Sequence, residues 1–383
     1  MNPNYQPLAE VRQKLRVEWY RCPINSTKLR ELMKRHDLQG WFQATGHLIL
    51  LVGTGLLSYF LWSRQMWFGF AIAFFAHGTV ASFFTGVAPH ELGHGTVFRT
   101  KWLNKFFLYL YSLLSWWDPF NYAMNHTYHH RYTLHSKGVR EVLLPLTPSL
   151  KPTFLLQMFT INLFTQSGRT FGKGGLIPTI IVTIKAALGV RISAEIPSRE
   201  WLQALHTDQP HEARKSMWWS RIILLFHGVV VMISVITSLW VLPLLVSTSA
   251  FVGNWWRYFV GLTQHCGLSD DVPDFRKCVR SITLDPLSEF LYWRMNWHTE
   301  HHMYAGVPCY NLKKVYQEVV QDMPKPRTLI GAWREMREIW KKQQTDPSYQ
   351  FDTPLPETAG NLHRDITDEL EYSIGELAPK GLR

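Results

Sequence analysis

The sequence predicts an all-α integral membrane protein, with four transmembrane helices in two hairpins and a cytoplasmic helical cap. Two observations predict this fold class. Four long apolar stretches occur in two closely spaced pairs, and nearly all of the 40 Lys and Arg residues lie outside them. A stretch of about 20 apolar residues is long enough to cross a bilayer as a helix. A globular domain rarely carries four such stretches, which argues against a soluble protein.

The apolar pairs define the two hairpins. The first pair covers residues 41–62 and 66–88, and the second covers about residues 219–242 and 244–262. Only a few residues connect the members of each pair, so each pair predicts a tight membrane hairpin. Tryptophan pairs lie at or near the ends of apolar runs, where aromatic side chains gather at membrane surfaces. These pairs are Trp116-Trp117, Trp218-Trp219 and Trp255-Trp256.

The charge distribution predicts the orientation. Lys and Arg concentrate in residues 1–40, 89–217 and 266–383, whereas the turn of the first hairpin carries Arg64 alone and the turn at Pro243 carries none. By the positive-inside rule, both termini and the middle segment are expected to be cytoplasmic. The net charge of +11 is consistent with loops that face anionic headgroups. Nothing resembling a nucleic-acid-binding motif accompanies this charge, so no nucleic-acid partner is predicted.

The remaining segments complete the predicted organisation. Residues 26–39 resemble a capped amphipathic helix that ends at Gly40. Three apolar segments are too short to cross a membrane and are expected to lie in its interface, with a third hairpin as the alternative; they are residues 104–117, 153–164 and 176–188. The predicted units are a cytoplasmic N-terminal amphipathic segment (1–40), hairpin 1 (41–88), a cytoplasmic segment (89–217), hairpin 2 (218–265), a second cytoplasmic segment with amphipathic helices at 310–342 (266–343) and a mobile tail (344–383).

Three histidine clusters predict a metal site. They are His90-Glu-Leu-Gly-His94, His126-Thr-Tyr-His129-His130 and His298-Thr-Glu-His301-His302. Helical residues at i, i+3 and i+4 share one face, so each triplet aims three imidazoles in one direction and the first cluster aims two. Eight nitrogen donors are too many for one ion and suit two. In the predicted topology all three clusters lie on the cytoplasmic side, and His265, at the cytoplasmic end of the fourth span, is a ninth candidate ligand.

The residue types narrow the chemistry. Imidazole suits iron, zinc and copper, and no cysteine lies within the clusters. A metal pair beneath apolar hairpins can meet a substrate that arrives from the bilayer. Attack on an unactivated C–H bond needs dioxygen, two electrons and a redox-active pair, for which iron is the best candidate. Carboxylate side chains are expected to orient the imidazoles. The candidates are Glu91, Asp118, Asp270, Asp271 and Glu300, and Asn296, two residues before His298, is a candidate to hold a ligating water.

Other histidines occur singly within the predicted spans. His47, His77 and His227 are each expected to pack against a backbone partner. Polar residues at such depth are often functional, but a lone imidazole carries no metal-binding pattern.

The three clusters, their order and their placement between and after the hairpins resemble the membrane fatty acid desaturase and hydroxylase superfamily. The resemblance covers about residues 40–320. His90-Glu-Leu-Gly-His94 resembles its first histidine box, and Asn296-Trp-His298-Thr-Glu-His301-His302-Met-Tyr, continuing to Leu312, resembles its third. The resemblance implies a di-iron centre facing the cytoplasm, dioxygen as co-substrate and an external electron donor. The implied iron ligands are His90, His94, His126, His129, His130, His298, His301 and His302, with His265 matching an additional histidine after the last span.

Three departures from the family pattern refine the comparison. Front-end desaturases usually have Gln where this chain has His298, and no fused cytochrome b5 with its haem motif is present. A separate ferredoxin, or cytochrome b5 with its reductase, is therefore the implied electron donor. Gly261 occupies the position where some acyl-CoA desaturases have an Asn with a water-mediated iron contact.

The predicted reaction is O2-dependent desaturation of a fatty-acyl or related lipid chain, with hydroxylation of a similar apolar substrate as the alternative. His90-Glu91-x-x-His94 is also the HExxH pattern of zinc proteases, in which the Glu is a general base. An intramembrane protease would leave both triplets unused. A metal transporter is a further alternative, but its ligands should lie within the spans.

Overall fold

The computed structural model describes residues 7–139, 150–165 and 174–360, which form a largely helical protein. The elements up to the middle of the chain are α1 (Leu8–Lys14), α2 (Ser26–Leu32), α3 (Asp37–Ser63), α4 (Trp67–Ser82), α5 (Ala88–Gly93), α6 (Lys101–Leu114), α7 (Pro119–Tyr132), α8 (Pro152–Phe159) and α9 (Leu176–Ala187). Those that follow are α10 (Arg199–Asp208), α11 (Pro210–Thr237), α12 (Val241–Val246), η1 (Ser249–Phe251), α13 (Trp255–Gly261), α14 (Phe275–Cys278), β1 (Ile282–Thr283), α15 (Pro286–Leu291), α16 (His298–Met303), η2 (Cys309–Asn311), α17 (Leu312–Val319), β2 (Arg327–Thr328) and α18 (Leu329–Gln343).

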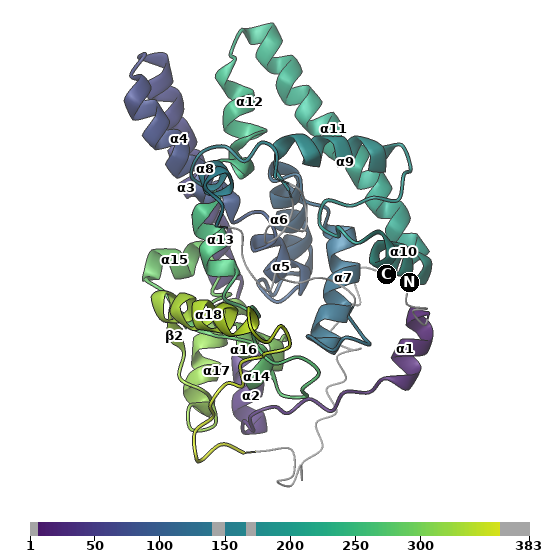
Figure 1. The fold of residues 1–383 in the computed structure, drawn as a ribbon. Coiled ribbons are helices and arrows are strands. Elements are labelled where there is room, and N and C mark those ends of the chain that lie inside the picture. The colour runs from purple at the N-terminus through teal and green to yellow at the C-terminus, as the bar shows by residue number, and fades with distance from the viewer. Residues whose placement is uncertain (1–6, 140–149, 166–173, 361–383) are drawn as a thin grey trace.

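Two helical hairpins project from the same end of the molecule. Figure 1 shows the α3–α4 pair and the α11–α12 pair on this side, with α14, α16, α17 and α18 gathered at the opposite end. Of the described helices, α3 and α11 are long and apolar enough to cross a membrane, and only 22% and 28% of their most apolar windows are buried. A core helix of a soluble protein would be mostly buried, so the outward apolar faces of α3 and α11 are those of a membrane protein.

The other member of each hairpin is shorter than predicted. α4 has 16 residues and α12 has six. The stretch 244–262, predicted as one helix, is divided among α12, η1 and α13. Gly253 adopts a left-handed conformation (φ +57°), and a Cβ there would lie 2.9 Å from the carbonyl oxygen of Phe75 in α4. The apolar composition of this stretch indicates an apolar environment, but it does not reveal a break in the helix that lets two backbones approach closely. The four-span topology and its orientation stay predictions.

Gly40 does not end the helix predicted over residues 26–39. α2 stops at Leu32, and Gly40 lies inside α3, which begins at Asp37. A Cβ at Gly40 would lie 2.6 Å from Cδ1 of the buried Phe98 ring. Gly40 is therefore explained by the close contact of α3 with Phe98 rather than by helix termination.

Of the helices that carry the histidine clusters, α5 and α7 lie in the middle of the molecule and α16 lies towards the end opposite the hairpins (Figure 1). α5 packs against α6 and α7, and α16 packs against α14 and α17. β1 and β2 form a short parallel pair. The tail predicted as mobile begins at residue 344, but residues up to 360 contact this end of the molecule: Leu268 bridges to Phe351, and the Gly360 N–H donates to Asp322 (2.5 Å). The remainder of the predicted tail, 361–383, lies outside the described residues.

Candidate metal centre

Three short helices and one turn carry the nine histidines of the predicted site. They are His90 and His94 at α5, His126, His129 and His130 in α7, His265 in the turn after α13, and His298, His301 and His302 in α16. The start of α7 is fixed locally by Asp118 and Pro119. The Asp118 carboxylate accepts from the backbone N–H groups of Phe120 (2.9 Å) and Asn121 (3.1 Å), and proline suits the first helical position.

The structure sorts these histidines into two groups. Donor nitrogens within each group lie within 4.8 Å of one another: group 1 is His90, His94, His126, His130 and His301, and group 2 is His129, His265, His298 and His302. His129 and His130 enter different groups, as do His301 and His302, because consecutive helical residues point about 100° apart. α7 and α16 therefore each contribute to both groups, and the HxxHH spacing is what divides their imidazoles.

The spacing of the ring nitrogens fits metal coordination. In group 1, Nε2 of His94 is 3.0 Å from Nε2 of His126, and Nε2 of His130 is 3.2 Å from Nε2 of His301. In group 2 the corresponding Nε2 distances are 3.0 Å for His265–His298, 3.1 Å for His129–His302 and 3.2 Å for His298–His302. Two nitrogens bound at about 2.1 Å to one ion, at a right angle, are about 3.0 Å apart.

Several imidazoles are oriented by a hydrogen bond at the other ring nitrogen. Nδ1 of His90 lies 2.8 Å from Oε1 of Glu91, and Nδ1 of His265 lies 3.0 Å from the carbonyl oxygen of Cys278. A proton on Nδ1 leaves the Nε2 lone pair free to bind a metal. Nε2 of His90 is buried and has no hydrogen-bond partner among the described residues. An ion in group 1 would satisfy this atom.

Burial also favours the neutral imidazole that metals bind. Desolvation lowers the pKa of His94 to about 4. Desolvation, followed by repulsion from neighbouring imidazoles, lowers the pKa of six further histidines well below the usual value: His90, His126, His130, His298, His301 and His302. Burial lowers the pKa of His265 in the same direction. At neutral pH these side chains are uncharged and present lone pairs rather than mutually repelling cations.

Glu91 and Glu300 are both fully buried beside the histidines of the site. Glu91 Oε1 lies 2.8 Å from His90 Nδ1 and 3.6 Å from His301 Nδ1, so this carboxylate contacts two imidazoles of group 1. Glu300 Oε2 accepts from the hydroxyl of Ser281 (2.6 Å). Burial raises the pKa of Glu91 to about 8 and that of Glu300 to about 7. A cation bound nearby would favour the ionised carboxylates and oppose these shifts.

The other predicted orienting residues differ in their surroundings. Asp118 caps α7 and accepts from Ser216, so its carboxylate serves the fold of α7. The exposed Asp271 accepts from Ser136, and Asp270 is exposed as well. Asn296 donates to the carbonyl of Ile282 (2.9 Å), and its Oδ1 is buried without a hydrogen-bond partner among the described residues. The predicted role of Asn296 as the holder of a ligating water stays a prediction.

Sequence reasoning missed two residues that orient imidazoles. The Thr133 hydroxyl donates to the carbonyl of His129 (2.7 Å) and can accept from Nδ1 of His302 (3.1 Å), so it joins two histidines of group 2. The Tyr122 ring stacks on His126 with centroids 5.0 Å apart and planes inclined by 16°. Tyr122 lies four residues before His126 on α7, and that spacing is the available sequence signal; Thr133 has none beyond its position after the triplet.

The lone histidines of the apolar helices pack as predicted. His47 Nε2 lies 3.1 Å from the Val80 carbonyl, and His77 Nε2 lies 2.8 Å from the Leu245 carbonyl. His227 Nε2 lies 3.0 Å from the Leu113 carbonyl. Each imidazole joins neighbouring elements through a backbone oxygen.

The fold and the site define a helical membrane protein with a buried histidine centre whose donors fit two metal ions. The chain belongs to the fatty acid desaturase family, whose model matches residues 65–333. This region includes the nine histidines of groups 1 and 2. The sn-1 oleoyl-lipid 12-desaturase of Picosynechococcus sp. is 22% identical over 347 residues, which cover 84% of this chain and 87% of that protein. The resemblance to the desaturase superfamily is confirmed. The protein is an oxidoreductase of the class that contains desaturases and related lipid-modifying oxidases.

Proposed function

We propose that this protein is an O2-dependent di-iron desaturase that introduces a double bond into a fatty-acyl or related lipid chain. The observation that carries the proposal is the division of nine imidazoles into two groups with donor nitrogens within 4.8 Å in each. Group 1 and group 2 would each hold one iron ion. Iron bound there supplies the oxidising power, drawn from dioxygen and two electrons, that removal of hydrogen from an unactivated alkyl chain requires.

The residues of the chain orient and shield this centre. Glu91, Thr133 and the Cys278 carbonyl hold individual imidazoles by their Nδ1 atoms, which directs Nε2 inward. Burial of seven of the nine histidines to 5% exposure or less keeps water away from the reacting groups. Exclusion of water suppresses side reactions of a strongly oxidising centre.

The surroundings of group 1 suit an apolar substrate. Phe83, Phe84 and Val87 precede His90 and are almost completely buried, in one apolar core with Leu92 of α5 and Leu51 of α3. This core joins the first hairpin to the helix that carries His90. The medium between the first hairpin and α5 is therefore apolar, as an alkyl substrate requires.

The proposed partners follow from the chemistry. A separate ferredoxin, or cytochrome b5 with its reductase, would deliver the two electrons. The proposed arrangement in the membrane is multi-pass, with both termini and the metal centre on the cytoplasmic side.

Lipid mass spectrometry tests the proposed reaction. Cells that express the protein should contain a lipid chain lacking two hydrogens relative to cells that do not. A gain of one oxygen instead would indicate the hydroxylase alternative. An unchanged lipid profile, with dioxygen and electron donor supplied, would refute both.

A matched pair of variants tests the proposed site. His301→Ala removes a fully buried imidazole of group 1 and should lower bound iron and abolish turnover. His211→Ala is the control, because His211 is 65% exposed and pairs with Glu212 at the start of α11. Normal turnover in His301→Ala, or equal loss in both variants, would refute the assignment.

A further inference from the structure

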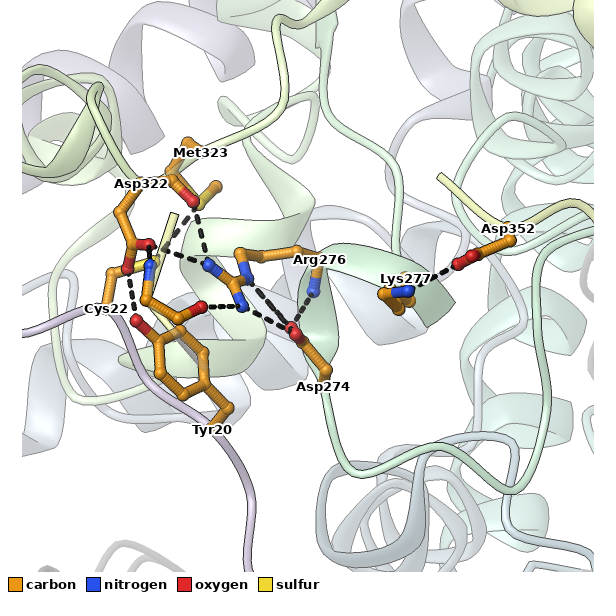
Figure 2. A network of polar contacts seen from close by, with 9 residues as sticks. Tyr20, Cys22, Asp274, Arg276, Lys277, Asp322, Met323 and Asp352 are labelled. Carbon is orange, nitrogen blue, oxygen red and sulfur yellow. Dashed lines mark hydrogen bonds and ion pairs between the residues drawn. The ribbon is translucent and has the colours of Figure 1, made fainter. Parts of the chain in front are cut away.

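A buried arginine outside the metal centre links distant parts of the chain. The Arg276 side chain is 1% exposed and lies in α14, eleven residues after His265. Its guanidinium donates to both carboxylate oxygens of Asp274, to the Asp322 carboxylate (2.8 Å) and to the Gly360 carbonyl (2.9 Å). It also lies 4.0 Å from the centre of the Tyr20 ring. Figure 2 shows Arg276 between the Asp274 and Asp322 carboxylates, with the Tyr20 ring beside it.

The partners of Arg276 come from three separate segments. Tyr20 precedes α2, Asp322 follows α17 and Gly360 follows α18. They also bind one another: the Tyr20 hydroxyl donates to Asp322 Oδ2 and the Gly360 N–H donates to Asp322 Oδ1, both at 2.5 Å. A planar guanidinium satisfies several acceptors in fixed directions, which a lysine ammonium cannot do. Arg276 therefore fixes α14 against three segments that the sequence keeps far apart.

α14 in turn contacts two histidines of group 2. At its C-terminal end the Cys278 carbonyl accepts from His265 Nδ1 (3.0 Å). At its N-terminal end the buried Phe275 ring lies 5.6 Å from the His302 ring, and Trp19 stacks on Phe275 at 4.0 Å. A displacement of α14 would move the hydrogen-bond acceptor of one imidazole and the packing partner of another.

The imidazoles of group 1 have different supports. His90 and His301 contact Glu91, which lies in α5, and His126 stacks on Tyr122 in α7. α14 also packs against α16, which carries His301 of group 1 together with His298 and His302 of group 2. The contacts of α14 with imidazole rings given above are to His265 and His302, so group 2 depends on Arg276 more directly than group 1 does.

We propose that Arg276 is a positioning residue for the metal site of group 2. By fixing α14, it holds the Cys278 carbonyl and the Phe275 ring against His265 and His302, and so sets the metal affinity of this group without setting that of group 1. This inference rests on the proposed function in requiring that each group binds an iron ion.

The test measures iron in the purified full-length protein and its release to a ferrous chelator. Arg276→Gln removes the positive charge and the planar guanidinium with its several N–H donors. We expect one of the two irons to be bound about tenfold more weakly, as for loss of residues that orient ligands, and to leave in a separate fast phase while the other behaves as in the wild type. Arg276→Lys keeps the positive charge without the planar guanidinium, and its fast phase should have a rate between those of the wild type and Arg276→Gln. Lys341→Gln is the control, since it removes an exposed ion pair with Glu338 within α18 (2.8 Å).

The iron-release results distinguish a failure of this inference from a failure of the proposed function. Two irons held as tightly in Arg276→Gln as in the wild type would overturn the inference and leave the proposed function intact. Equal acceleration of both phases would also overturn it, because general destabilisation affects both groups. A wild-type protein with fewer than two irons would overturn the proposed function and this inference together. If Arg276→Gln does not fold, Asp322→Asn should accelerate the same single phase, and unchanged release in that variant would refute the role of Arg276.

Discussion

The buried carboxylate of Glu91 offers the sharpest test of how group 1 is organised. Its Oε1 lies 2.8 Å from His90 Nδ1 and 3.6 Å from His301 Nδ1, and its side chain is completely buried. A hydrogen bond to a charged group contributes about 1.5–3 kcal/mol. Because about 1.4 kcal/mol corresponds to a factor of ten, loss of this bond should weaken metal binding by about 10- to 100-fold, the range found for residues that orient metal ligands.

Two substitutions at Glu91 separate the effects of charge and contact. Glu91→Gln keeps an oxygen acceptor for His90 but cannot ionise, so we expect iron affinity of group 1 to fall by about tenfold, with turnover retained at saturating iron. Glu91→Ala leaves the imidazole N–H without its acceptor, and we expect a loss of about 100-fold. Iron retention against a chelator and product formation by mass spectrometry are the two assays.

The opposite pattern would refute this reasoning. If Glu91→Gln bound iron as tightly as the wild type and lost all turnover, Glu91 would act on the substrate or on water rather than on His90. That result would favour the general-base role of the HExxH alternative. Equal iron affinity in Glu91→Gln and Glu91→Ala would show that the hydrogen bond to His90 has no influence on the metal.

Three further predictions address group 2, the helix contact at Gly40 and acid sensitivity. Thr133→Val preserves volume but leaves His302 Nδ1 without its 3.1 Å hydroxyl partner, so iron release from group 2 should become about tenfold faster in the chelator assay; unchanged release would contradict this. Gly40→Ala places a Cβ 2.6 Å from the Phe98 ring and should destabilise the protein by about 1–3 kcal/mol, seen as a lower thermal midpoint in detergent; an unchanged midpoint would show that the ring can move aside. Burial lowers the pKa of His94 from 6.5 to about 4, so the unfolded metal-free protein binds more protons between these values. The folded metal-free protein should therefore have its full stability above pH 6.5 and lose stability as the pH falls towards 4. A stability that increases as acid is added over this range would contradict the assignment.

The histidine pattern was sufficient to predict which residues would meet. The i, i+3, i+4 spacing of His126, His129 and His130 is a property of any helix, and the structure gathers these residues with the other clusters. The expectation that each triplet aims its three imidazoles in one direction was wrong, because adjacent histidines such as His129 and His130 point about 100° apart and enter different groups. The pattern also does not predict that His129 joins His265 while His130 joins His301, because that depends on how α7, α16 and the turn after α13 pack.

Other features could not be read from local sequence. Thr133 and the Cys278 carbonyl orient imidazoles through contacts that span 169 and 13 positions. Asp118 was predicted to orient a metal ligand because it lies near the histidines in the sequence. In the structure its carboxylate caps the N-terminus of α7. Hydropathy located the apolar stretch 244–262 without revealing that Gly253 breaks it.

By itself, the sequence determined the helical character of the chain, the nine imidazoles and the family to which they belong, because these depend on periodicity, composition and residue spacing. The tertiary structure alone decided how the imidazoles divide into two groups and which carbonyls, carboxylates and hydroxyls hold them. It also brought Tyr20, Asp322 and Gly360 to Arg276. Asp322 and Gly360 lie 46 and 84 positions from Arg276, and Tyr20 lies farther away still. The geometry of such contacts follows from packing of the whole chain rather than from any local pattern.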